Sequence, residues 1–409
     1  MPEPFTLYRA IQAFPAGHHQ TFTPGGAGPL TCFASVRETL VQGEAAAREM
    51  ADDKRRARVR DAVAETIRYH HVADVPVGIF LSAGIDSTVI ASASGEQVGP
   101  GCTTFTLGFR EFRGSARDET VLAEAVAKQL GTEQITRWIG AGDFGDAYED
   151  LLGAMDQPSI DGVNTYLVSK LAAEAGLKVV LSGLGGDEMF GGYPSFIEVP
   201  KLARLAASVP GARRLGPSVR AMTSGWIGRF TSPKYAGLLE YGSGLFGAYL
   251  LRRSLFMPWE VPGLLDPDLV AAGLDRLQLV ERGEDSISGI RSTHAAVTAL
   301  EMTHYMRDRL LRDSDWASMA HSLELRVPLV DWTLFETLAP LIAGASPPRK
   351  ADLATVPIGG LPPEIANKPK TGFEVPVRDW LRRGAGAKTT ADRGLRDWGR
   401  VIHASFVPV

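Results

Sequence analysis

The stretch Val75–Ser92, which reads VPVGIFLSAGIDSTVIAS, constrains the fold more than any other part of this chain. Val77–Leu81 is a continuous apolar run with the length and the composition of a buried β-strand. A turn of small and hydroxyl residues comes next, and a helix is predicted to begin near Asp86. A strand that passes into a helix through such a short turn is typical of βαβ units, in which parallel strands alternate with helices.

The segments after this turn continue the alternation of strands and helices. Each predicted strand is short and rich in β-branched, aromatic or aliphatic residues. The predicted strands are 102–109, 132–139 and 177–182, and the predicted helices are 118–130, 144–155 and 164–175. This order predicts an α/β fold with a parallel sheet flanked by helices on both faces. Residues 195 to about 345 are helix-like, which predicts a mostly helical C-terminal part.

Two of the predicted helices have a defined apolar face. Between residues 44 and 71, Val59, Val63 and Ile67 recur every four residues and are predicted to face the core. The lysines and arginines of that segment alternate with acidic residues, so we interpret them as a solvated face rather than a nucleic-acid site. In the helix that begins after Asp118, the predicted apolar stripe consists of Val121, Leu122, Ala125, Val126 and Leu130.

The composition excludes several classes of protein. Apolar residues make up 44% of the 409 residues and charged residues 22%, which indicates a globular chain with a sizeable core. The formal charge of −4 provides no basic field for nucleic acid or an acidic membrane. Two cysteines, Cys32 and Cys102, predict no disulfide framework, and the N-terminus does not resemble a signal peptide. We therefore predict a cytoplasmic protein without a membrane span.

The turn after Leu81 has the chemistry of a site for a polyphosphate. Backbone N–H groups at the start of a helix attract anions, and small residues let a phosphate come close to them. Ser82 and Ser87 add hydroxyl donors. Asp86 would repel a phosphate, but it is a suitable ligand for the Mg²⁺ that accompanies one. The alternative is a plain strand–helix turn in which Asp86 caps the helix.

The motif LSAGIDST at residues 81–88 resembles the pyrophosphate loop of the ATP pyrophosphatase superfamily. Three further stretches resemble motifs of one family within it, in the synthetase half of asparagine synthetases. They are LSGLGGDEMFGGYPSF (181–196), DWASMAHSLELRVPLVD (315–331) and KPKTGFEVPVRDWLR (368–382). The four motifs occur in the order in which that family has them.

The resemblance implies a fold, a reaction and a site. The fold is the adenine nucleotide alpha hydrolase-like fold of ATP pyrophosphatases. The reaction is ATP-dependent amide-bond formation through an acyl-adenylate, by an AMP-forming carbon–nitrogen ligase that converts aspartate, an amine donor and ATP to asparagine, AMP and pyrophosphate. Lys370, Asp86 and Asp187 match catalytic positions, and the two aspartates also match Mg²⁺ ligands. The candidate ATP-binding residues are Leu81, Ser82, Gly84, Asp86, Ser87, Leu107, Ser182 and Gly183.

The N-terminal segment resembles the last strands of the glutaminase half of the same family, through YRAIQAFPAGHHQTF at residues 8–22. A turn is predicted at Pro24–Gly26 with a short strand on each side, and this piece is expected to lean on the rest of the chain. We therefore predict a glutaminase remnant at 1–40 and an asparagine synthetase-type domain at 41–409. The family's glutaminase nucleophile is an N-terminal cysteine, whereas position 2 is Pro2. Synthesis that depends on ammonia, or on a separate glutaminase, is expected.

Departures from the family motifs bear on the substrate. Leu184 stands where the family has a glutamate that helps to handle the attacking amine, and a leucine can neither hydrogen-bond nor take a proton. Ala83 replaces a glycine and is expected at negative φ, because a positive φ would cost roughly 1 kcal/mol. Trp316 replaces an arginine. Candidates for a replacement acid–base group are Asp308, Asp313 and Asp315.

Other interpretations stay open on these residues. Asp187 could cap a turn, and Lys370 could be a solvated loop lysine. The carboxylate substrate could be a sugar acid, a natural-product precursor or a peptide; a non-catalytic nucleotide-binding partner subunit and a tRNA-modifying enzyme are further alternatives. Structural roles are expected for Glu324 and Arg326 as an ion pair, for His321 in packing, and for Met302, Met306 and Met319 in the core.

Overall fold

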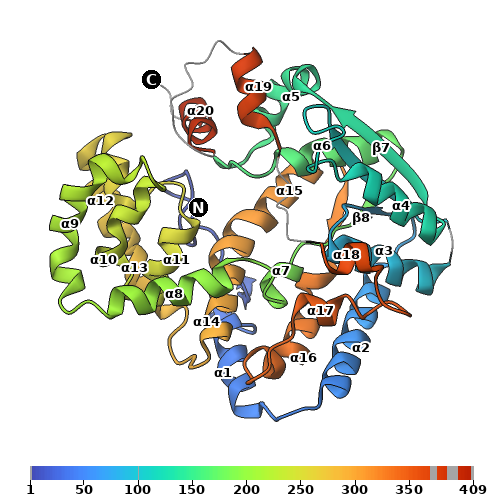
Figure 1. The fold of residues 1–409 in the computed structure, drawn as a ribbon, viewed down its shortest axis with the longest axis horizontal. Coiled ribbons are helices and arrows are strands. Elements are labelled where there is room, and N and C mark those ends of the chain that lie inside the picture. Colours follow the sequence, from blue (N-terminus) through green and yellow to red (C-terminus); the bar gives the residue numbers. More distant parts are fainter. Residues whose placement is uncertain (1, 100, 369–374, 385–394, 407–409) are drawn as a thin grey trace.

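A computed structural model of the chain describes residues 2–99, 101–368, 375–384 and 395–406. A five-stranded sheet with its helices occupies one side of the molecule, and a helical part occupies the other (Figure 1). The sheet strands are β5 (Val77–Phe80), β6 (Thr103–Phe109), β7 (Glu133–Ile139), β8 (Val179–Leu181) and β9 (Glu324–Arg326). They are all parallel, in the order β7-β6-β5-β8-β9. The predicted parallel α/β sheet is therefore confirmed.

Helices cover both faces of this sheet, because its strands are apolar on both sides. On one face, Ile79 packs into a core with Val89 of α3. On the other face, Phe105 shares a second core with Leu167 of α6. The helices of the first face are α2 (Asp52–His70), α3 (Ile85–Val98) and α4 (Thr120–Leu130), and those of the second are α5 (Ala141–Ala154) and α6 (Val163–Glu174).

The predicted helical C-terminal part is also confirmed. It begins after the short helix α7 (Gly186–Met189), and its first helices form the lobe on the left of Figure 1. They are α8 (Ser195–Ala207), α9 (Ala212–Ile227), η1 (Pro233–Gly237), α10 (Leu238–Tyr241), α11 (Leu245–Arg253), η2 (Pro258–Gly263), α12 (Pro267–Leu277) and α13 (Leu279–Asp285). Within the described part of the chain, no helix combines the length and the hydropathy that crossing a bilayer requires.

A long central helix joins the lobe to the sheet. It consists of α14 (Thr293–Leu300), the π-helix η3 (Glu301–Leu311) and α15 (Arg312–Met319). The helices after β9 complete the described chain. They are η4 (Pro328–Val330), α16 (Trp332–Ile342), α17 (Lys350–Leu353), α18 (Pro363–Ala366), α19 (Val377–Gly384) and α20 (Arg396–Phe406).

A buried polar node fixes the lobe to the central helix. The Glu301 carboxylate is fully buried and accepts hydrogen bonds from Ser195 and from Arg253, whose Nε lies 3.1 Å away. The Arg253 guanidinium lies between two aromatic rings, 4.2 Å from the Tyr193 centroid and 4.0 Å from the Tyr305 centroid. A buried carboxylate with this many donors is stable only in one arrangement, so the node orients the lobe.

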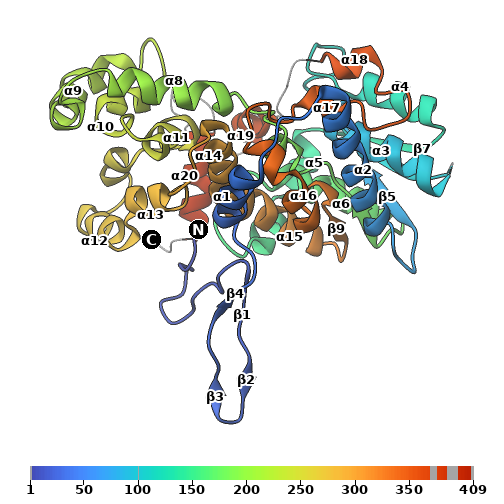
Figure 2. The same ribbon diagram turned by 90° about the horizontal axis from the view of Figure 1, so that it is seen from below.

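The N-terminal segment forms two short ribbons and a helix. β1 (His18–His19) pairs with β4 (Thr31–Cys32), and β2 (Phe22–Thr23) pairs with β3 (Gly26–Ala27), both antiparallel. The two strands predicted around Pro24–Gly26 are therefore confirmed. The ribbons extend away from the body (Figure 2), and α1 (Val36–Ala46) comes next in the chain.

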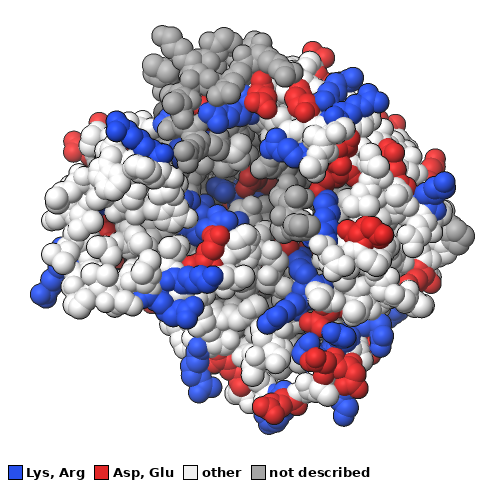
Figure 3. All heavy atoms as spheres, viewed as in Figure 1, with Lys and Arg blue, Asp and Glu red and all other residues white. Residues whose placement is uncertain are grey.

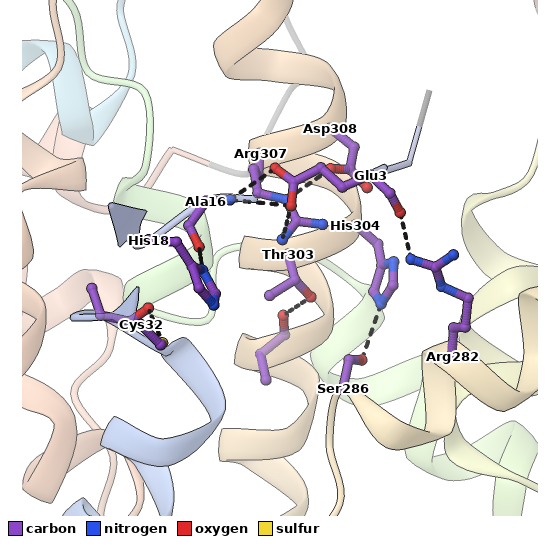
Figure 4. A network of polar contacts seen from close by, with 12 residues as sticks. Glu3, Ala16, His18, Cys32, Arg282, Ser286, Thr303, His304, Arg307 and Asp308 are labelled. Carbon is purple, nitrogen blue, oxygen red and sulfur yellow. Dashed lines mark hydrogen bonds and ion pairs between the residues drawn. The ribbon is translucent and has the colours of Figure 1, made fainter. Parts of the chain in front are cut away.

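The expectation that this segment leans on the rest of the chain holds for its first residues and for its end, where Leu40 of α1 is fully buried in the core. The Glu3 carboxylate lies 3.6 Å from Arg307 of η3 and accepts from the Ala16 amide (Figure 4). Arg282 of α13 donates to the Glu3 carbonyl at 2.5 Å. Glu3 thus attaches the start of the chain to η3 and α13, whereas the ribbons are mostly exposed.

Several side-chain predictions can be compared with the structure. Val59, Val63 and Ile67 are fully buried on α2, as predicted, although residues 47–51 separate α2 from α1. The stripe on α4 is partly wrong, because Val121 is 70% exposed and Ala123 and Ala127 are buried instead. The regular apolar spacing did not reveal which face of α4 is buried. Met302 and Met306 are buried as predicted, whereas Met319 is exposed.

Candidate active site at the sheet switch point

The candidate site lies where the sheet changes its direction of growth. The chain adds β6 and β7 on one side of β5 and then adds β8 on the other side, so β5 and β8 are neighbours with Ile79 opposite Leu181. The turns that come after two such strands meet at the carboxyl edge of the sheet. This position is where open α/β sheets bind their ligands.

The turn after β5 is held by its own serines. The Ser87 hydroxyl donates to the Ser82 carbonyl at 2.8 Å and accepts from the Ser82 amide at 3.2 Å. Gly84 precedes α3 at a φ of −92°, and no side chain caps this helix. Asp86 therefore lies inside the first turn of α3 rather than at its cap, which contradicts the plain capping interpretation. Among the described residues, only Gln278 and Ser322 are non-glycines at positive φ, so Ala83 has the expected negative φ.

Two carboxylates and one ammonium meet between the two turns. The Lys350 ammonium, at the start of α17, contacts Asp86 Oδ1 and lies 2.8 Å from Asp187 Oδ1. All three side chains are less than one-fifth exposed. Burial favours the neutral amine, but the two carboxylates outweigh it and raise the pKa of Lys350. The structure thus brings Asp86 and Asp187 to one cationic group, in agreement with their expected proximity.

Sequence reasoning missed Lys350. It lies in the Pro-rich stretch SPPRKADL, between two of the quoted motifs, and has no periodicity or glycine pattern around it. The one clue to a buried lysine would have been that two buried carboxylates require a cation beside them.

Glycines of the second motif make this approach possible. A Cβ at Gly183 would lie 2.7 Å from the Ser87 amide nitrogen, and one at Gly186 would lie 2.5 Å from Asp86 Oδ1. A Cβ at Gly192 would lie 1.9 Å from Asp187 Oδ1. The glycine-rich composition of residues 183–192 is therefore required for the contact between the two turns.

We expect Gly183→Ala to weaken nucleotide binding by at least about 10-fold, because the methyl group must push the Ser87 amide away from β8. Titration with a fluorescent ATP analogue measures the effect. Gly176→Ala is not a suitable control, because that glycine has positive φ, but Gly145→Ala on α5 has open space and should bind normally. Equal affinities of the Gly183 and Gly145 variants would contradict the packing argument.

A cavity of about 800 Å³ contains these groups. Every predicted site residue within the described part of the chain lines it, while Lys370 falls outside the described residues. These lining residues are Leu81, Ser82, Gly84, Asp86, Ser87, Leu107, Ser182, Gly183 and Asp187. In the space-filling view, a hollow with both kinds of charge opens near the middle of the face, between the lobe and the sheet (Figure 3).

The residues present fit a nucleotide with Mg²⁺. Two carboxylates that can share one cation are suitable for Mg²⁺ when phosphate oxygens and water complete its shell. The described residues contain no cluster of three or more metal-ligating side chains. Asp86 and Asp187 are therefore the candidate metal ligands.

Leu184, which stands where the family has a glutamate, lines the cavity and packs against the core. The three aspartates that could replace that glutamate as an acid–base group differ in their surroundings. Asp313 is buried and accepts hydrogen bonds from Ser159 at 2.6 Å and from Trp316 Nε1 at 3.1 Å. Burial raises the pKa of Asp313 to about 6. Asp308 is paired with Arg307 at 2.8 Å, and Asp315 is exposed.

Trp316, the departure from the family's arginine, has a packing role. Its ring fills the space beside Gly162, where a Cβ would lie 2.2 Å from the indole. His321 packs on Tyr166 with ring centroids 4.4 Å apart, as expected. Glu324 and Arg326 form the expected ion pair at 2.7 Å.

Glu188, next to Asp187, is fully buried and accepts a hydrogen bond from the Tyr193 hydroxyl at 3.0 Å. Burial, with a contribution from the charge of Asp187, raises the pKa of Glu188 to about 7. Between pH 4.5 and 7, Glu188 therefore keeps its proton in the native state, whereas it is ionised in the unfolded state, where its pKa is the ordinary 4.5. Glu188 should thus lower stability progressively as the pH rises from about 4.5 to 7.

We expect Glu188→Gln to remove this pH-dependent loss of stability. The loss amounts to roughly 3 kcal/mol in the free energy of unfolding between pH values below 4.5 and above 7. Urea unfolding at pH 5 and at pH 8 measures it as the difference between variant and wild type, so that other titrating groups cancel. Glu65→Gln, on an exposed position of α2, serves as the control and should keep the wild-type pH dependence. An unchanged dependence in the Glu188 variant would show that Glu188 ionises normally.

Comparisons with known proteins agree with this arrangement. The family model described as asparagine synthase matches residues 58–406. Asparagine synthetase [glutamine-hydrolyzing] 1 of Bacillus subtilis is 30% identical over 93% of this chain and 58% of its own length. A putative asparagine synthetase [glutamine-hydrolyzing] of Mycobacterium bovis is 31% identical over 94% of this chain and 57% of its own length. The chain thus spans somewhat more than half the length of these relatives.

A parallel sheet flanked by helices, with a glycine-lined turn at its switch point, is consistent with the α/β fold of ATP pyrophosphatases. Within this class, the chain belongs to the asparagine synthase family.

Proposed function

We propose that this protein forms an amide bond at the expense of ATP, through an acyl-adenylate, as an AMP-forming carbon–nitrogen ligase. The observation that carries the proposal is the contact of Asp86 and Asp187 with one cationic group, Lys350, inside the switch-point cavity. Aspartate and ammonia are the default substrates, with asparagine, AMP and pyrophosphate as products.

Different residues around the cavity would bind the phosphates of the nucleotide and its metal ion. The amides at the start of α3 and the hydroxyl of Ser82 lie where they can bind phosphate oxygens. Asp86 and Asp187 would hold Mg²⁺, which neutralises the charge of the β- and γ-phosphates when bound. Lys350 would move from the carboxylates to the phosphates once the metal replaces it, because the two cations compete for the same oxygens.

The substrate carboxylate would attack the α-phosphorus, so that a new P–O bond forms and the bond to pyrophosphate breaks. An amine then attacks the acyl carbon, the C–N bond forms, and AMP leaves. Lys370, which matches the family's lysine near the reacting carbonyl, would stabilise the charge that develops there. A preorganised donor of this kind contributes typically about 10²–10³ in rate.

The source of the amine is part of the proposal. Free ammonia or a separate glutaminase is the proposed source of the nitrogen. Leu184 cannot accept a proton, which favours a second candidate: the same chemistry on another carboxylate, such as a sugar acid, a natural-product precursor or a peptide.

Exchange of labelled pyrophosphate into ATP tests the proposal, because exchange requires formation and reversal of an acyl-adenylate. We expect exchange that depends on an added carboxylate and on Mg²⁺. The panel should contain aspartate, sugar acids and peptide acids. A protein that binds ATP but exchanges no pyrophosphate with any of them would be a nucleotide-binding subunit rather than a ligase.

A further inference from the structure

A second cavity, of about 770 Å³, lies between the lobe and the central helix. Its lining combines aromatic rings with charged groups. The aromatic residues are Phe246, Tyr249, Phe256 and Tyr305, and the arginines are Arg253, Arg309, Arg312 and Arg400. A cavity of this size is several times larger than free aspartate requires and is within the range that holds drug-sized ligands.

The second cavity and the nucleotide cavity share a wall. Asp313 lines the second cavity, and the next residue, Ser314, lines the nucleotide cavity. Two contacts close this wall: the hydrogen bond of 2.6 Å from Ser159 to Asp313, and the ion pair of 3.5 Å between Arg309 and Asp161. The beginning of α15 therefore contributes to both cavities, and the loop before α6 contacts it there.

The charged groups of the second cavity differ in how firmly they are held. Arg253 forms an ion pair and a hydrogen bond with the buried Glu301 carboxylate. Arg312 is paired at 2.9 Å with Asp156, whose side chain is 58% exposed, and such an exposed pair contributes little to stability. Arg312 can therefore exchange its partner for a ligand carboxylate at low cost, close to the shared wall.

We infer that the second cavity binds the carboxylate substrate, and that this substrate is a peptide-like acid with an aromatic or aliphatic side chain. Arg312 holds its carboxylate near the wall, and the aromatic rings of the cavity hold its apolar body. This inference rests on the proposed function, since it names the substrate of the same reaction. Opening of the Ser159–Asp313 contact would bring the carboxylate to the nucleotide.

Pyrophosphate exchange with N-acetyl dipeptide acids of aromatic and aliphatic side chains tests the inference, with free aspartate and the matching dipeptide amides as comparisons. We expect at least one dipeptide acid to have a KM about 10-fold or more below that of aspartate, and the amides to be inactive. Arg312→Ala should raise the KM of the dipeptide acid by about 10–100-fold without changing the KM of ATP, because a charge-assisted hydrogen bond is lost.

Arg137→Ala is the matched control. Arg137 forms an exposed ion pair of the same length, 2.9 Å, with Glu174, and it lines neither cavity. Calorimetric titration of the dipeptide acids into wild type and Arg312→Ala, without ATP, gives a readout that does not depend on exchange. Exchange with aspartate alone, unaffected by Arg312→Ala and without dipeptide binding, would overturn the inference and leave the proposed function intact. Dipeptide binding that Arg312→Ala weakens, without any exchange, would support the cavity and overturn the reaction.

Discussion

Replacement of Asp86 by asparagine is expected to reduce carboxylate-dependent pyrophosphate exchange by at least about 10²–10³-fold while the protein stays folded. Asparagine has the same shape, so the turn keeps its packing against Gly183 and Gly186. Lys350 keeps Asp187 as a partner, at 2.8 Å in the parent structure. The variant loses one of the two negative charges that would hold a metal on the phosphates.

The size of this effect depends on the number of ligands. The described residues offer two carboxylates at the switch point and no third metal-ligating side chain beside them. Removal of one charge therefore removes half of the protein's attraction for Mg²⁺, and a neutral amide oxygen replaces it poorly.

Exchange rates measured over a range of Mg²⁺ concentrations would check this prediction, together with thermal melting of both proteins. Asp61→Asn, on the exposed side of α2, is the control and should behave as wild type. If Asp86→Asn exchanged pyrophosphate normally at low Mg²⁺, Asp86 would not be a metal ligand, and the interpretation of the turn would be wrong.

The sequence predicted the sheet because each of its strands and helices has a local signal. β5 and β8 are short apolar runs with small residues directly after them, and alternation with helices implies parallel pairing. The candidate site residues came from the family resemblance, and their first two motifs lie after strand ends, which must meet if these strands are neighbours. The order β6-β5-β8 provides that neighbourhood.

The features that the sequence could not provide depend on contacts between distant segments. Lys350 contacts two aspartates that lie 264 and 163 positions before it in the sequence, and the stretch around Lys350 has no periodicity. The exposure of Val121 depends on which face of α4 packs against the core, where Ala123 and Ala127 are buried, and the apolar stripe alone does not determine that face. The second cavity is formed by the packing of the lobe against η3, and no motif marks it.

Lys350→Met should affect both stability and activity, because Lys350 is the only described cation that contacts both carboxylates. Without the ammonium, two mostly buried negative charges repel each other. Breaking such a pair costs about 3 kcal/mol, so the nucleotide-free variant should melt earlier than wild type. Lys128→Met, on an exposed position of α4, should melt normally.

The effect of added Mg²⁺ on melting shows whether Lys350 stabilises the protein by neutralising the two carboxylates or only by packing. In wild type, the ammonium competes with the metal, so Mg²⁺ without nucleotide should stabilise the protein little. In Lys350→Met, the ammonium no longer competes with the metal for the two carboxylates, so Mg²⁺ should restore much of the lost stability, whereas the same ionic strength of NaCl should not. Pyrophosphate exchange should nevertheless stay about 10²-fold or more below wild type, because the group that would move with the phosphates is gone. A variant that melts early but does not respond to Mg²⁺ would show that Asp86 and Asp187 do not form a shared cation site.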